Sequence, residues 1–156
     1  MFSVSLPTCS GTDARAALEA ALAQVAEESF FAVVEVAPDD WRESSPVESD
    51  WLEATVAFHG AGEGVLTCRL PGALARDLSM AFLGADVDDT PGGIDDMVGE
   101  VANMICGCWL TRAFPTRLFQ LDGPIIRRDV AAPSGDWLVH LLNGVPLGLA
   151  VSANGV

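Results

Sequence analysis

Positive charge is scarce in this sequence. Eight lysine and arginine residues stand against 22 aspartates and glutamates in a chain of 156 residues, and the formal net charge is −14. Phosphate backbones and anionic lipid surfaces repel such a chain. The charge therefore argues against nucleic acid and against a membrane surface as partners, and it is compatible with a protein partner that carries a basic patch.

Long hydrophobic runs are also missing, although half of the residues are hydrophobic. Charges or glycines interrupt every apolar run well before the roughly 20 residues that a bilayer-spanning helix needs. The first six residues lack the basic flank and the long apolar segment of a secretion signal. We expect no membrane insertion, a cytoplasmic location, and one domain over 1–156 with a sizeable core.

Cysteine and histidine are too few and too scattered to suggest a metal centre. Two of the four cysteines would project about 200° apart on a helix, which suits neither a zinc knuckle nor a short disulfide. We expect no metal bound by this chain, and buried or partly buried thiols in a reducing compartment. The acidic runs at 39–40 and 86–89 are expected to be solubilising. The residues concerned are Cys9, Cys68, Cys106, Cys108, His59 and His140.

The pattern of helix formers, β-branched residues and turn residues divides the chain into alternating elements. Strong helix formers predict helices over 13–30 and 94–114, and a proline-first, glycine-last pattern predicts a third over 71–83. Thr90 is the expected N-cap of the 94–114 helix, with Pro91 in its first position. The remaining predictions are a strand over 31–36, a loop over 37–49, a hairpin of 51–59 with 64–70, extended segments at 118–122 and 125–127, and a hairpin of 136–142 with 145–152 around Asn143-Gly144.

The order helix–strand–hairpin occurs twice, at an offset of roughly 80 to 90 residues. Both hairpins open with the same tripeptide, Asp50-Trp51-Leu52 and Asp136-Trp137-Leu138. We therefore predict an α+β fold built from pseudo-repeats at about 12–84 and 91–153. In this fold a mainly antiparallel sheet carries two long helices packed on it.

The 94–114 helix has a polar stripe opposite its apolar face. Two glycines in this stripe cost about 1 kcal/mol each relative to alanine, a loss that a purely solvated face would not need. Small residues beside an acid and an amide instead indicate a surface that a partner approaches closely. The stripe comprises Asp96, Gly99, Glu100, Asn103 and Gly107.

The first long helix lacks this acid–amide pair. Placing Phe31 on Phe114 brings Asp13 to Asp96, and it puts alanines, at positions 17 and 20, where the second helix has Glu100 and Asn103. The duplicated architecture therefore does not by itself require the pair.

The spacing Asp96-x-x-x-Glu100-x-x-Asn103 resembles the signature of the CheC/CheX/FliY chemotaxis phosphatase family. The run from Glu100 to Gly107, E-V-A-N-M-I-C-G, is similar to the CheX branch, and the order of elements fits over about residues 12–153. One departure concerns a downstream proline of the family. Its position is held here by Ile126, and the nearest proline, Pro124, lies two residues earlier.

The resemblance implies a phosphatase that acts on the aspartyl-phosphate of a CheY-like receiver domain. In that scheme Asn103 orients the attacking water, while Glu100 pairs with the receiver's lysine. Asp96 assists docking or orients Glu100, the two glycines admit the receiver's backbone, and Pro124 is a further candidate contact. Mg²⁺ is expected on the receiver and no cofactor on this chain. The resemblance also implies a homodimer, formed through sheet edges.

Three other interpretations stay open at this point. The chain could be a non-catalytic binding module related to flagellar motor-switch domains, or a small-molecule binding domain that uses space between sheet and helices. The stripe could also be a solvated helix face, with Asp96 merely complementing the helix dipole.

Overall fold

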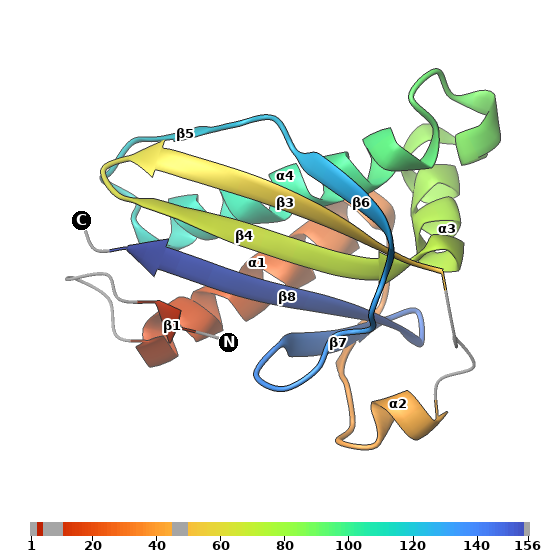
Figure 1. Ribbon diagram of the computed structural model, residues 1–156, viewed down its shortest axis with the longest axis horizontal. Helices are drawn as coiled ribbons and strands as arrows, with labels where there is room; N and C mark the ends of the chain where they lie inside the picture. Colours follow the sequence, from red (N-terminus) through yellow and green to blue (C-terminus); the bar gives the residue numbers. More distant parts are fainter. Residues whose placement is uncertain (1–2, 5–10, 45–49, 155–156) are drawn as a thin grey trace.

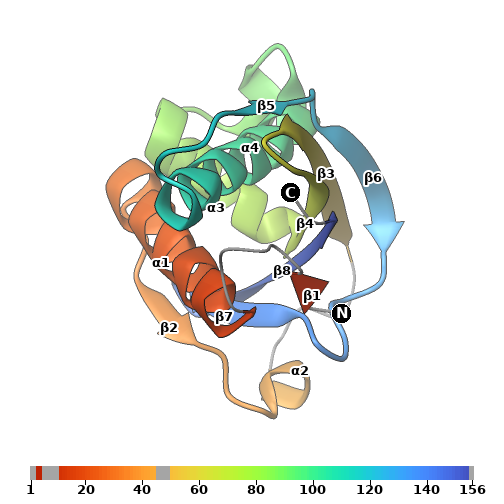
Figure 2. The same ribbon diagram turned by 90° about the vertical axis from the view of Figure 1, so that its left-hand side faces the viewer.

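One mostly antiparallel sheet carries the long helices on a single face, as Figures 1 and 2 show for this computed structural model. The structure describes residues 3–4, 11–44 and 50–154. The predicted α+β class and the two long helices packed on an antiparallel sheet are confirmed. None of the helices in these ranges is both long and apolar enough to cross a membrane.

The elements follow one another in the predicted order, with three short additions, β1, α2 and a 3₁₀ turn. The helices are α1 (Gly11–Phe30), α2 (Trp41–Ser44), α3 (Gly72–Leu83) and α4 (Gly93–Ala113), with a 3₁₀ turn η1 at Val87–Asp89. The strands are β1 (Ser3–Val4), β2 (Val34–Val36), β3 (Trp51–Gly60), β4 (Glu63–Pro71), β5 (Phe119–Leu121), β6 (Ile125–Val130), β7 (Leu138–Leu142) and β8 (Val145–Asn154).

The strand order is symmetric about the centre of the sheet. It runs β2-β7-β8-β4-β3-β5, with β6 also pairing with β3 and β1 with β8. Hairpin β3–β4 therefore lies beside hairpin β7–β8, and each hairpin receives its outer strand from the other half of the chain. The repeated tripeptide marks equivalent places, because Trp51 begins β3 and Trp137 directly precedes β7. This order is what a duplicated chain would produce, although the duplication itself stays a prediction.

The core lies between the sheet and the two long helices. Alternate residues of β3 and β4 point inward, so that Ala54 faces Cys68 and Val56 faces Leu66 across the pair, all four buried. Above them the Trp109 ring of α4 packs edge-on against Phe58, with ring centroids 5.7 Å apart. Its indole N–H donates to the Ala14 carbonyl of α1 at 3.2 Å, which fixes α4 beside α1.

The first strand after α1 is shorter than predicted. α1 closes with a hydrogen bond from the Ala32 N–H to the Ala26 carbonyl, and Phe31 takes a left-handed conformation with φ 53°. That geometry terminates a helix and is usually occupied by glycine. The chain must first leave this turn, so β2 begins only at Val34. The predicted loop over 37–49 also contains the short helix α2, and 45–49 lies outside the described residues.

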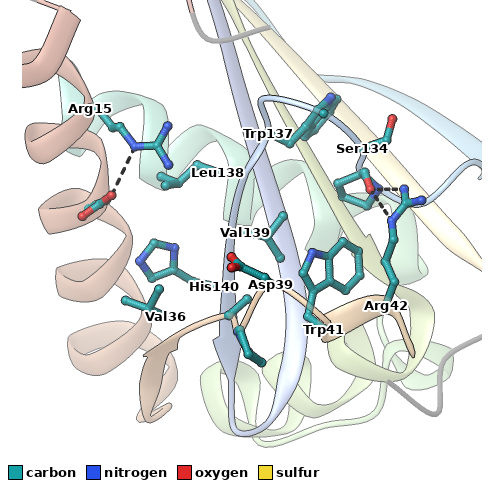
Figure 3. Close-up of a pocket in the computed structure, with 15 residues that line it drawn as sticks. Arg15, Val36, Asp39, Trp41, Arg42, Ser134, Trp137, Leu138, Val139 and His140 are labelled. Carbon is teal, nitrogen blue, oxygen red and sulfur yellow. Dashed lines mark hydrogen bonds and ion pairs between the residues drawn. The ribbon is translucent and has the colours of Figure 1, made fainter. Parts of the chain in front are cut away.

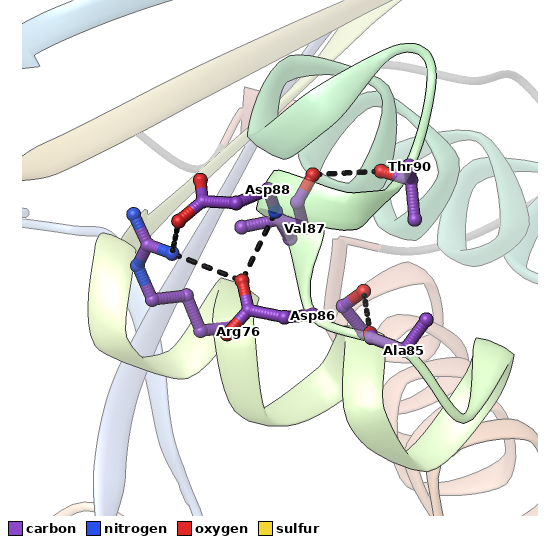
Figure 4. A network of polar contacts seen from close by, with 7 residues as sticks. Arg76, Ala85, Asp86, Val87, Asp88 and Thr90 are labelled. Carbon is purple, nitrogen blue, oxygen red and sulfur yellow. Dashed lines mark hydrogen bonds and ion pairs between the residues drawn. The ribbon is translucent and has the colours of Figure 1, made fainter.

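The predicted start of the second long helix is wrong in detail. Thr90 is the residue after the 3₁₀ turn, and its hydroxyl donates to the Val87 carbonyl, so it does not cap α4. Gly92 holds the N-cap position instead. Figure 4 shows what fixes this connection: the Arg76 guanidinium bonds both Asp86 and Asp88 at 3.2 Å, and Val87 is fully buried. These acids serve an ion-pair network that holds the start of α4.

The predictions for two turns and for the described cysteines are confirmed. α3 ends at the left-handed Gly84, and Asn143 and Gly144 both have positive φ in the turn between β7 and β8. Cys68 and Cys106 are buried thiols and Cys108 is half-buried, as expected, whereas Cys9 lies outside the described residues. Burial raises the pKa of Cys68 and Cys106 to about 12, so both stay protonated.

Candidate functional site

Glu100 and Asn103 lie on the surface of α4, one helical turn apart on the same side. Glu100 is exposed and Asn103 is half-buried. Neither side chain makes a hydrogen bond or an ion pair with any residue in the described ranges. A carboxylate and an amide held on a rigid helix, with their bonding capacity unused, are available to a partner.

Pro124 is brought to the same part of α4 from the connection between β5 and β6. A Cβ built on Gly99 would lie 2.8 Å from Pro124 Cγ and 3.5 Å from Ile126 Cδ1. Gly99 is buried, and Pro124 of the same chain occupies the space that a side chain at position 99 would need. This differs from the expectation that Gly99 admits a partner's backbone. Pro124 and Ile126 thus both lie close to Gly99, and whether Pro124 takes the role of the family's proline stays a prediction.

Gly107 differs from Gly99 in its surroundings. A Cβ at this position would meet nothing within 4 Å, and the residue lies one turn beyond Asn103. The helix surface beside the amide is therefore open at Gly107. Of the two glycines in the stripe, only Gly107 leaves room for something outside the chain.

The two acids in the first turn of α4 have different surroundings. Asp95 accepts from the Arg128 guanidinium of β6 at 2.8 Å, which ties β6 to the helix. Asp96 is exposed and has no ion pair in the described part of the chain. Its carboxylate lies where a Cβ on Gly92 would be, over the first turn of the helix. Negative charge there complements the helix dipole, and the same carboxylate is free to meet a partner.

An apolar hollow beside Glu100 was not apparent from the sequence. Its volume is about 300 Å³, and it lies between the end of α3 and the start of α4. Phe82 and Leu83 line it, with 40% and 51% of their surface exposed, and Met97 lies in its wall. The sequence indicates this hollow only through apolar residues close to Gly84, and buried core residues would give the same pattern.

The site offers acid and amide chemistry and no metal centre. Among the described residues, no group of three or more histidine, cysteine, aspartate or glutamate side chains is placed to hold a metal ion. The groups present can accept and donate hydrogen bonds and can pair with a cation. They can position a water molecule, but they hold no activated nucleophile.

The fold described above and a sequence match together identify the class of this protein, a family of chemotaxis proteins. Residues 52–130, just over half of the chain, match the model of the family described as chemotaxis phosphatase CheX. The chain belongs to this family. No functionally curated protein matches it in sequence.

Solved structures of that family share the fold. The chemotaxis protein CheX from Vibrio vulnificus superposes with a TM-score of 0.65 at 15% identity, covering 91% of this chain and 97% of that one. A chemotaxis protein CheX from Desulfovibrio desulfuricans gives 0.60 at 18%, with 90% and 99% covered. A CheX–CheY–BeF3–Mg²⁺ complex from Borrelia burgdorferi gives 0.59 at 14%, with 91% and 98% covered.

Proposed function

We propose that this protein removes the phosphoryl group from the aspartyl-phosphate of a CheY-like receiver domain. The observation that carries the proposal is the unpartnered Glu100–Asn103 pair, on the open face of α4 in a member of the CheX phosphatase family. The Borrelia burgdorferi relative is in a complex with CheY, BeF3 and Mg²⁺, which supports a receiver as the partner.

The reaction asks little of this chain. An acyl phosphate is already activated, and the receiver brings its own acidic pocket, Mg²⁺ and lysine. The remaining task is to place a water in line with phosphorus, which is a matter of orientation. Asn103 suits it, because an amide can accept from and donate to one water without acting as a nucleophile.

Docking is assigned to the residues around Asn103. Glu100 pairs with the receiver's lysine, a charge-assisted contact that fixes the register of the two proteins. Asp96 adds negative charge one turn earlier, and the open surface at Gly107 admits the receiver's backbone. The hollow at Phe82 and Leu83 takes an apolar side chain of the receiver at the edge of the contact.

The test is the decay of phosphate on a Mg²⁺-loaded CheY-like receiver, with wild type and the variants Asn103→Ala and Glu100→Ala. Removal of the water-positioning amide should lower kcat by about 100-fold or more, a loss of roughly 2.7 kcal/mol. Glu100→Ala should mainly raise KM. Because Asn103 has no hydrogen-bond partner among the described residues and alanine favours helices, the Asn103 variant should stay folded.

Glu27→Ala is the matched control, because Glu27 is an exposed acid on α1 with no ion pair in the described residues. Its decay rate should equal that of wild type. Unchanged decay in Asn103→Ala refutes the catalytic role. Saturable receiver binding without faster phosphate loss in the wild-type protein would identify a non-catalytic binding module instead.

The homodimer stays a proposal that rests on the resemblance. β2 is an outer strand of the described sheet; Val36 within it and Phe31 and Val33 just before it are exposed. A second copy could add to that edge through backbone hydrogen bonds. Light scattering of wild type and Val33→Lys tests this, and an unchanged dimer in the variant refutes this edge as the interface.

A further inference from the structure

The apolar hollow beside Glu100 continues into an exposed apolar end of α3. The last four residues of this helix, Met80, Ala81, Phe82 and Leu83, are all apolar and all exposed. A helix that is apolar on every side normally lies inside a core. Here the end of such a helix lies at the surface, directly beside the Glu100–Asn103 pair, so it is available to the partner that this pair binds.

The apolar wall of the hollow is held in place by the fold. The Phe82 ring packs on Phe30, with ring centroids 5.3 Å apart, and Phe30 is a buried core residue. The helix then ends at the left-handed Gly84, whose N–H donates to the Met80 carbonyl at 3.0 Å. A surface that is already ordered loses little conformational entropy on binding, which favours recognition of one particular shape.

The rim of the hollow carries negative charge of one sign only. Asp96 and Glu100 line it from α4, and no lysine, arginine or histidine is among its described lining residues. Neither acid is ion-paired within the described ranges, in contrast to Asp86 and Asp88, which Arg76 neutralises nearby. The complement of an apolar hollow with two unpaired carboxylates at its rim is an apolar side chain with basic groups beside it.

A larger cleft at the β2–β7 end of the sheet has no such bias. Its volume is about 480 Å³, and its lining carries charges of both signs (Figure 3). Arg15 and Arg42 line it together with Glu19 and Asp39, so it favours neither a cation nor an anion. The hollow beside Glu100 is therefore the more selective of the two surfaces.

The Glu100–Asn103 pair by itself gives little choice between receivers. In the proposed reaction these two side chains meet the phosphoryl group and the lysine, which every receiver that undergoes the reaction must bring. Discrimination between receivers requires contacts outside these shared groups. The hollow lies next to Glu100 and contacts the receiver's surface beyond the phosphorylation site.

We propose that the hollow selects the receiver, by binding an apolar side chain that has a lysine or arginine beside it on the receiver's surface. A receiver with a polar or acidic residue at that place is rejected, because it leaves Phe82 and Leu83 uncovered or meets the carboxylates of Asp96 and Glu100. The inference rests on the proposed function, since the hollow acts as part of the same contact with a receiver.

The experiment is a calorimetric measurement of Kd for a panel of CheY-like receivers loaded with Mg²⁺ and BeF3, so that binding is measured without hydrolysis. Leu83→Ala should raise Kd by about tenfold for the receiver that wild type binds most tightly, because a buried leucine contact is lost. It should raise Kd by at most about twofold for the weakest binder, so the spread of affinities narrows.

Leu118→Ala is the matched control, because Leu118 is an 87% exposed leucine outside the hollow. Leu83 is itself 51% exposed and ends a helix, so both variants should melt at the wild-type temperature. Leu118→Ala should leave every Kd unchanged.

The charge of the rim is tested with Asp96→Asn against Asp77→Asn, an exposed acid of α3 that does not line the hollow. Asp96→Asn should raise Kd by about threefold or more at about 50 mM salt, and the difference should disappear at about 500 mM, where surface charges are screened. Asp77→Asn should match wild type at both salt concentrations.

The proposal is overturned if no receiver of the panel binds saturably, or if Leu83→Ala binds every receiver as wild type does. It is equally overturned if Leu118→Ala weakens binding as much, or if Asp96→Asn has no effect at low salt. The proposed function fails separately, if Asn103→Ala leaves the decay of receiver phosphate unchanged, and that result does not depend on these affinities.

Discussion

The two interior glycines of α4, Gly99 and Gly107, should respond differently to the same substitution. Gly99 and Gly107 are both interior helix residues, so alanine at either position should gain about 1 kcal/mol from helix propensity. At Gly107 the new methyl group meets nothing within 4 Å, and the full gain should appear. Gly107→Ala should therefore raise Tm by roughly 2–4 °C in a domain of this size.

At Gly99 the same methyl group would lie 2.8 Å from Pro124 Cγ and 3.3 Å from its Cβ. A proline ring cannot turn aside, and overpacking of this kind costs about 1–3 kcal/mol. Gly99→Ala should thus be less stable than Gly107→Ala by about 1–3 kcal/mol in urea denaturation followed by tryptophan fluorescence.

A double-mutant cycle identifies the cause. In a Pro124→Ala background the Cγ is gone, so most of the penalty of Gly99→Ala should disappear. Equal stability of the two glycine variants in the otherwise wild-type chain would show that Pro124 does not rest on Gly99.

Three further predictions concern other contacts and backbone positions of the fold. Glu53 is buried on β3, where its carboxylate lies 2.8 Å from Arg69 and 3.6 Å from Arg127. Glu53→Gln should therefore lower the free energy of unfolding by about 2 kcal/mol in urea denaturation. Arg127→Ala removes an exposed guanidinium and should lower it by under about 1 kcal/mol. Phe31→Gly should stabilise the chain by about 1 kcal/mol, because φ is 53° and the ring is 76% exposed; a lower Tm in the variant would contradict this. The pKa of His140, followed by NMR, should lie below its ordinary value of about 6.5. As the pH falls, the unfolded chain therefore takes up this proton before the folded chain does. The free energy of unfolding should decrease as the pH falls through about 6.5. That part of the pH dependence should be absent from His140→Gln.

Much of the fold is predictable because its signals are local. The two long helices follow from runs of helix formers, and Asn143-Gly144 specifies a tight hairpin turn without reference to the rest of the chain. Prediction failed where tertiary structure replaces the usual residue. Phe31 occupies a position where glycine is the common signal, and Thr90 is a good capping residue that bonds backward into the 3₁₀ turn.

The candidate site shows the same division between local and distant information. Glu100 and Asn103 can be recognised in the sequence because they form a short motif with Asp96, in which residues three or four apart share one face of a helix. The sequence alone does not explain why position 99 is glycine, because the proline that covers it comes from a segment after β5. The apolar hollow forms only where the end of α3 meets the start of α4, so no single stretch of sequence predicts it.

The exchange of outer strands between the halves of the sheet has a consequence for how the chain can be divided. β2 belongs to the first half and pairs with β7, while β5 and β6 belong to the second half and pair with β3. A fragment ending near Gly84 would keep its hairpin but lose the strands that flank it. Two fragments cut between η1 and α3 should therefore be poorly folded alone and should reconstitute one another when mixed, as interlocked pieces do. A half-length ancestor of this architecture would have had to be an obligate strand-swapped pair, and fusion of its two copies would have made that association permanent.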